Sequence, residues 1–132
     1  MKTIIITILT VFVASFANGQ GIMAKWPQLK TFHGVMSQTF HPSEEGNLEP
    51  IKKRSGEMVE KADLLAKSTI PAEFNSKEVV AAVKKLETDS KKLNKLVKNN
   101  KSDKEITEAL SKLHDVFMKL LDYVVMKTII NK

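Results

Sequence analysis

The chain has 132 residues, a formal net charge of +6 and no cysteine. The lack of cysteine excludes disulfide bonds, a thiolate nucleophile and haem attachment through a CxxCH motif. The positive charge comes from lysines that are interleaved with Glu and Asp, and Arg54 is the only arginine. Nucleic-acid-binding proteins usually cluster Arg with aromatic residues, so we expect no nucleic acid partner.

The first 19 residues have the pattern of a cleaved secretory signal. Lys2 supplies a positive start, residues 4–14 are almost wholly apolar, and Ala17 and Gly19 are the small residues before a cleavage site at Gln20. This pattern predicts export to the periplasm or the medium, and a mature domain of residues 20–132. The apolar residues in 124–130 are too few and too interrupted to predict a membrane anchor.

Proline, glycine and polar caps divide the mature chain into four amphipathic segments. We expect one helix from about Trp26 to His41, ended by Pro42, and a second from about Pro50 to Lys67. The third should begin at the cap Asn75–Ser76 and end near Asn99, and the fourth should run from the capping box Ser102–Glu105 to about Lys127.

Apolar side chains recur in the last three segments at alternating spacings of four and three. In the fourth segment the series is Ile106, Leu110, Leu113, Phe117, Leu120 and Val124. Such repeats joined by short connections predict an all-α fold, an antiparallel up-down-up-down four-helix bundle. Ile70 and Phe74 lie in the connection before the third helix, and we expect them to close one end of the bundle.

The sequence lacks the motifs of common enzymes, including GxSxG, HExxH and Gly-rich phosphate loops, and it lacks the ExxH pairs of di-iron bundles. We therefore expect a binding protein rather than an enzyme. The first and fourth helices of such a bundle are neighbours, so His33 or His41 can approach His114. Which of the two does so depends on a register that the sequence leaves open.

A transition metal is the first hypothesis for the ligand. His41-Pro-Ser-Glu-Glu45 puts an imidazole and two carboxylates in one short stretch, a donor set that suits divalent transition metals. His33 lies within the apolar arc of its helix, and a buried imidazole needs a partner. The expected ligands are His33 or His41, together with Glu45 and His114.

Haem is the second hypothesis. A methionine on one helix and a histidine on an antiparallel one can ligate haem iron, and Met36 with His114 or His33 with Met118 would supply such a pair. The signal segment, the four helices and the apolar seams, with Met36 on the first helix and His114 on the fourth, resemble the exported cytochrome b562 and cytochrome c-prime class of bundles.

The resemblance implies haem b held non-covalently by Met36 and His114, and a role in electron transfer. The CxxCH motif of the c-prime type is absent, and His114 lies farther from the chain end than the haem histidine of that class. A third hypothesis is a bundle without cofactor that binds a partner protein through its surface. The sequence is compatible with either a monomer or a dimer.

Overall fold

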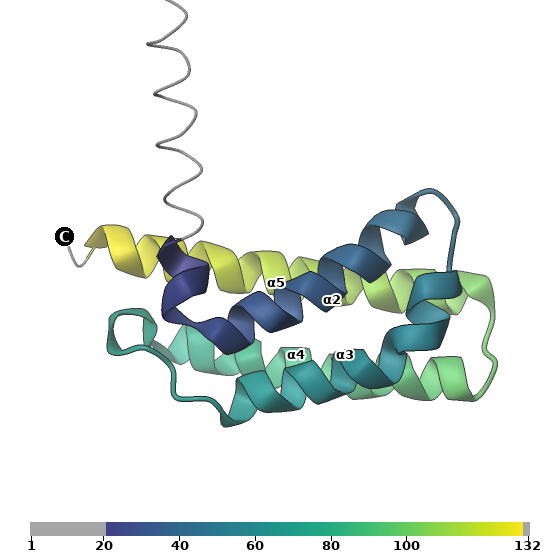
Figure 1. Ribbon diagram of the computed structural model, residues 1–132, viewed down its shortest axis with the longest axis horizontal. Helices are drawn as coiled ribbons and strands as arrows, with labels where there is room; N and C mark the ends of the chain where they lie inside the picture. The colour runs from purple at the N-terminus through teal and green to yellow at the C-terminus, as the bar shows by residue number, and fades with distance from the viewer. Residues whose placement is uncertain (1–20, 131–132) are drawn as a thin grey trace, which may run out of the picture.

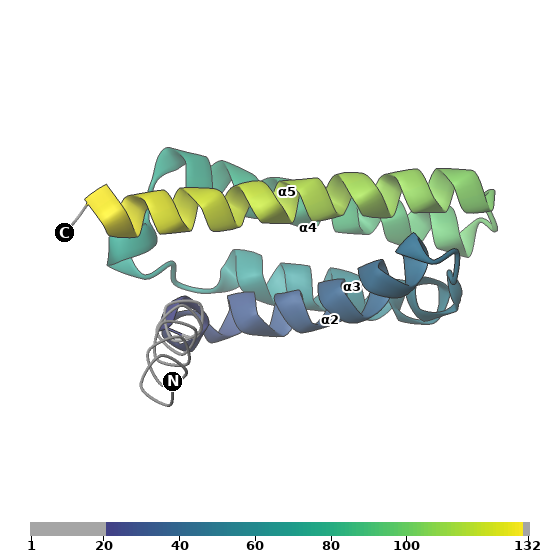
Figure 2. The same ribbon diagram turned by 90° about the horizontal axis from the view of Figure 1, so that it is seen from above.

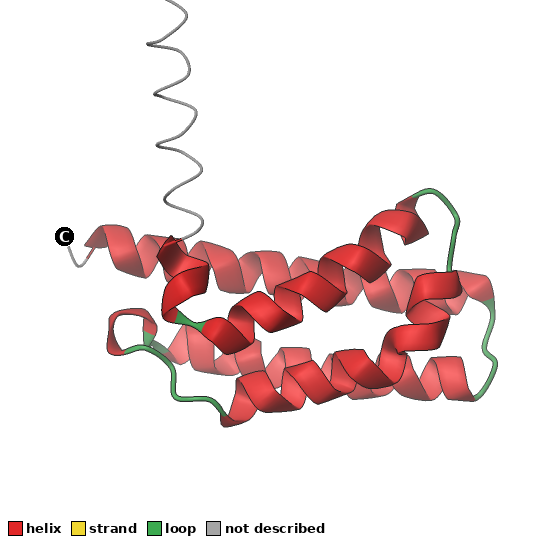
Figure 3. Cartoon of the chain, viewed as in Figure 1, coloured by secondary structure: helices red, strands yellow, loops and turns green. Residues whose placement is uncertain are grey.

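The computed structural model describes residues 21–130, so the predicted signal peptide lies outside the described residues. The described chain contains α2 (Pro27–Glu44), α3 (Glu49–Lys67), the short 3-10 helix η1 (Ala72–Phe74), α4 (Lys77–Lys98) and α5 (Asp103–Ile130). Residues 21–25 are helical as well. Figure 3 shows helices and loops and no strand in this part of the chain, which confirms the prediction of an all-α protein.

The four long helices lie side by side, and each returns along the one before it (Figures 1 and 2). Helices that follow each other in the sequence pack along their lengths, whereas the contact between α2 and α5 is the smallest of the four helix–helix contacts. Figure 2 shows α2 with α3 on one side and α4 with α5 on the other. The side formed by α2 and α5 is therefore the least tightly closed. No helix within residues 21–130 is both long enough and apolar enough to cross a membrane.

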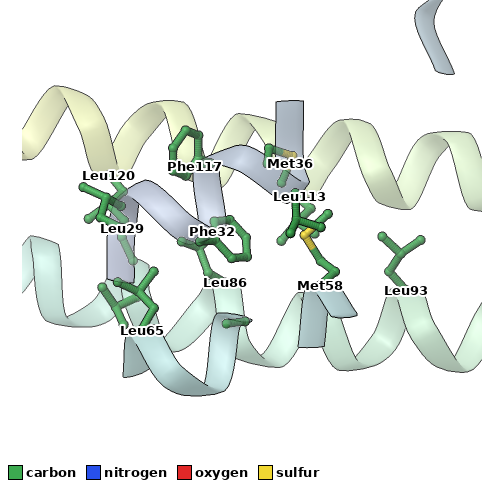
Figure 4. Close-up of a cluster of buried hydrophobic side chains, with 14 of the residues drawn as sticks. Leu29, Phe32, Met36, Met58, Leu65, Leu86, Leu93, Leu113, Phe117 and Leu120 are labelled. Carbon is green, nitrogen blue, oxygen red and sulfur yellow. The ribbon is translucent and has the colours of Figure 1, made fainter. Parts of the chain in front are cut away.

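The apolar series predicted for the fourth helix forms the centre of the structure. Its six members, Ile106 to Val124, are all buried in α5. Figure 4 shows Phe32 and Met36 of α2 among Leu113 and Phe117 of α5. Burying one such side chain stabilises the fold by about 1.5–3 kcal/mol relative to leaving it exposed. The core thus accounts for why four amphipathic segments without disulfides stay together.

The prediction that Pro42 ends the first helix is wrong, because α2 continues to Glu44 with Pro42 inside its last turn. A proline there removes one N–H donor from the helical ladder but leaves the carbonyls free to accept. The amides of Glu45 and Asn47 both donate to the Pro42 carbonyl oxygen, at 3.1 and 3.0 Å. Gly46, at a φ of 84°, then turns the chain into α3.

Side-chain caps begin both later helices. The predicted capping box is confirmed: the Glu105 amide donates to Ser102 Oγ at 3.2 Å, and the Ser102 amide donates to Glu105 Oε2 at 3.1 Å. In α4 the cap is Ser76, whose Oγ accepts from the Val79 amide at 3.2 Å. Of the predicted cap residues Asn75 and Ser76, Ser76 is thus the one that caps the helix.

The connection between α3 and α4 closes one end of the helices. Phe74 of η1 is buried and its ring stacks on Trp26, with 6.4 Å between the ring centroids. The Trp26 indole N–H donates to Ser68 Oγ at 2.8 Å. Ile70 is half-buried against the same core. The expected role of Phe74 as an end plug is confirmed, and it draws the start of α2 onto the η1 connection.

Two buried serines make a matched test of polar burial. Ser55 Oγ of α3 donates to Asn94 Oδ1 at 2.9 Å, whereas the buried Ser90 Oγ has no partner among the described residues. We expect Ser90→Ala to raise the free energy of unfolding by about 1 kcal/mol and Ser55→Ala to lower it by a similar amount. Urea unfolding of both variants measures this. Equal effects of the two substitutions on the free energy of unfolding would contradict the finding that, among the described residues, Ser55 is hydrogen-bonded and Ser90 is not.

Candidate functional site

Histidine and phenylalanine rings meet across the contact between α2 and α5. The His33 imidazole of α2 stacks on the Phe117 ring of α5, with 5.5 Å between centroids and an angle of 9° between planes. Phe117 is buried and also contacts Phe32, at 5.7 Å between centroids. One face of the His33 ring is thus covered by the opposite helix, while the rest of the side chain stays exposed.

A second imidazole–phenyl pair crosses the same two helices, but here α2 supplies the phenylalanine and α5 the histidine. The Phe40 ring of α2 lies on the His114 imidazole of α5, with 3.8 Å between centroids and 8° between planes. His114 is half-buried. Histidines from both helices therefore lie in one seam, which we call the α2–α5 seam and which comprises His33, Phe40, His114, Phe117 and Met118.

Met118 belongs to this seam by its position on α5. It follows His114 by four residues, which places the two side chains on the same face of the helix. It also directly follows Phe117, the residue on which His33 stacks. Met118 is exposed, whereas Met36 is 1% exposed and lies in the core. Of the two methionines considered from the sequence, Met118 is the one that solvent reaches.

The other predicted ligands lie at the end of α2. His41 is exposed, and its Nδ1 lies 3.5 Å from Glu44 Oε2. Glu45 is the C-cap residue of α2 and is also exposed. No three His, Cys, Asp or Glu side chains within residues 21–130 come together as a group that could hold a metal. The predicted set His33, His41, Glu45 and His114 is therefore not assembled around one point.

The seam changes the electrostatics of His33. Partial burial lowers the pKa of His33 below its ordinary value of 6.5, and the positive charge of His41 lowers it further. The neutral imidazole is thus the favoured form near neutral pH. Neither His33 nor His114 has a hydrogen bond to another described residue, and their recorded contacts are ring stacks. Both rings therefore keep nitrogens that can bind a ligand.

The apolar pattern of the sequence places His33 and His114 near this interface and Phe117 in the core, but it does not predict the ring pairs. Which imidazole meets which phenyl ring depends on how far α2 slides along α5, and the repeat of four and three is compatible with more than one register. The seven-residue spacing of His33 and Phe40 is the signal that they share a face.

The lowered pKa of His33 predicts a pH-dependent stability. Because the unfolded chain binds a proton at this histidine more readily than the folded chain, the free energy of unfolding should fall as the pH drops below about 6.5. His33→Gln should make this fall smaller in urea unfolding at about pH 7 and about pH 5. His41→Gln should raise the pKa of His33 in an NMR titration. Identical pH profiles for wild type and His33→Gln would contradict the prediction.

No protein-family model matches this chain, and neither the curated proteins nor the solved structures include a significant match. The resemblance to cytochrome b562 therefore stays a prediction.

Proposed function

We propose that this protein is exported, folds as an antiparallel up-down-up-down bundle, and binds a copper ion in the α2–α5 seam. The proposed ligands are the imidazoles of His33 and His114 and the thioether of Met118. The observation that carries the proposal is the pair of imidazole–phenyl stacks across the seam, at 5.5 and 3.8 Å between centroids. They bring histidines of both helices to one interface.

The stacked rings remain able to bind metal. Each stack uses the face of an imidazole, whereas metal ligation uses a nitrogen lone pair that lies in the plane of the ring. The near-parallel planes, at 9° and 8°, leave the ring edges clear of the phenyl group that covers the face. The phenyl rings thus orient the imidazoles in the way that hydrogen-bond partners orient metal-binding histidines in other sites.

The donor set favours copper over harder metals. Imidazole binds copper well, and a thioether is a soft ligand that selects Cu(I), while Mg²⁺, Ca²⁺ and Mn²⁺ prefer carboxylate oxygens. Among the described residues, the carboxylate that pairs with a histidine is Glu44, and it pairs with His41 and not with His33 or His114. The lowered pKa of His33 also favours metal binding, because an imidazole must be deprotonated to act as a ligand.

The seam supports haem less well. A porphyrin between Met36 and His114 would have to enter where the Phe40 ring lies 3.8 Å from the His114 ring, and Met36 is packed in the core. Haem binding by Met36 and His114 stays a prediction, as do the carboxylate-containing site with Glu45 and the bundle without cofactor. In the copper proposal the exposed Met118, and not the buried Met36, is the methionine ligand.

Titration with Cu(I), under reducing conditions and in competition with a chromogenic chelator, tests the proposal. We expect one copper per chain. His114→Asn and Met118→Leu should each weaken binding at least about tenfold, equivalent to about 1.4 kcal/mol. His41→Asn is the control, because it removes an exposed imidazole that pairs with Glu44 and is not a proposed ligand. Its ring contacts Phe40 only edgewise, at 6.0 Å between centroids and 56° between planes, so the affinity should change less than about twofold.

The control variant His41→Asn, with Glu45→Gln and Met36→Leu, separates the alternatives. Zinc or nickel bound in preference to copper and lost in His41→Asn or Glu45→Gln would overturn the thioether site in favour of the carboxylate site. A Soret band after addition of haemin, lost in Met36→Leu, would favour haem. No binding of any of these would leave the bundle without cofactor. Circular dichroism at each step checks that the variants keep their helices.

A further inference from the structure

The C-terminal turns of α5 expose a cluster of large apolar side chains. Tyr123, Val125, Met126, Ile129 and Ile130 are 39, 41, 55, 62 and 71% exposed; we call these five residues the α5 tip. Figures 1 and 2 both show this end of α5 reaching beyond α2, α4 and η1. Single exposed apolar residues are ordinary, but a cluster on one projecting helix end is typical of a contact surface.

Part of the α5 tip lies on the same side of α5 as a lysine-rich groove between α4 and α5. Lys119, Tyr123, Met126 and Ile130 follow each other at spacings of four, three and four, which keeps them on one side of the helix. Lys119 lines an open groove of about 770 Å³ between α4 and α5. The groove is lined by six lysines and four carboxylates, so it carries an excess of positive charge. The apolar side chains thus extend from a basic groove.

The lysines nearest the tip lack acidic partners. Lys77 and Lys84, in the first turns of α4, line a shallow hollow beside the η1 connection. Within residues 21–130 neither these two nor Lys119 and Lys127 of α5 has a carboxylate within ion-pair distance. Four unneutralised ammonium groups therefore lie on the two helices that carry or adjoin the tip.

We propose that the α5 tip, together with Lys119 and Lys127 of α5 and the adjoining Lys77 and Lys84 of α4, docks on an anionic lipid surface. The apolar side chains would enter the headgroup region, while the lysine stems lie along it and the ammonium groups meet the lipid phosphates. Charge complementarity selects this occupant: a second copy of the chain would bring the same unneutralised lysines against each other. The proposal is independent of copper, because none of its residues is a proposed ligand.

Sedimentation with lipid vesicles tests the proposal, using protein recovered from the exported fraction of an expressing cell. We expect binding to vesicles of equal parts phosphatidylglycerol and phosphatidylcholine, and at least about tenfold weaker binding to phosphatidylcholine alone. Raising the salt to about 0.5 M should weaken binding as well. The double variant Met126→Ser/Ile130→Ser should lose at least about tenfold in partitioning.

Two variants make the result specific to this face. Leu64→Ser removes an apolar side chain of similar exposure on α3, 49% against 55% for Met126, and should bind like wild type. Lys119→Gln/Lys127→Gln should weaken binding to anionic vesicles and leave the weak binding to neutral ones unchanged. All the substituted positions are at least partly exposed, so the helical content should be kept, which circular dichroism checks.

Three results would overturn the proposal. They are equal binding to neutral and anionic vesicles, wild-type binding by Met126→Ser/Ile130→Ser, and no vesicle binding at all. A dimer in sedimentation velocity that the same double variant dissolves, without vesicle binding, would assign the α5 tip to a second copy instead.

Discussion

The contact between α2 and α5 is the basis of the proposed copper site. It is smaller than the contacts of α2 with α3, of α3 with α4 and of α4 with α5, and it includes two imidazole–phenyl stacks. A histidine in such a position is covered on one face and open at its edge. This arrangement combines packing, which orients the ring, with a nitrogen that no other residue occupies. A fully packed interface would have buried these nitrogens, and an open one would have left the rings without orientation.

The apolar surface is unevenly distributed along the molecule. Of the eight large apolar side chains exposed among the described residues, Leu64 lies near the end of α3, Val80 near the start of α4 and six on the second half of α5. These three helix regions meet at the η1 connection. The opposite end consists of the α2–α3 and α4–α5 turns, with polar residues such as Glu44, Asn47 and Asn100. A contact surface is therefore favoured at the C-terminal end of α5, whereas Leu64 and Val80 are single exposed apolar side chains on other helices.

The substitutions that test the two proposals lie on different faces of the same helix. His114 and Met118 lie on the side of α5 that meets α2, and Lys119, Tyr123 and Met126 lie on the side that borders α4. Adjacent positions on a helix differ by about 100° in direction, so Met118 and Lys119 separate the two faces. Substitutions on one face can therefore be made without changing the other, and the two activities can be tested independently.

Sequence alone determined the helices and the core side of each. The alternation of four and three, the Ser102–Glu105 capping box and the burial of Phe74 were all predictable, because they depend on local spacing and on hydrophobicity. The end of α2 was predicted too early, since the continuation past Pro42 depends on hydrogen bonds formed by the following turn. Only the tertiary structure decided that His33 meets Phe117 and His114 meets Phe40. Pairings between helices far apart in the sequence depend on register and tilt, which local periodicity leaves open.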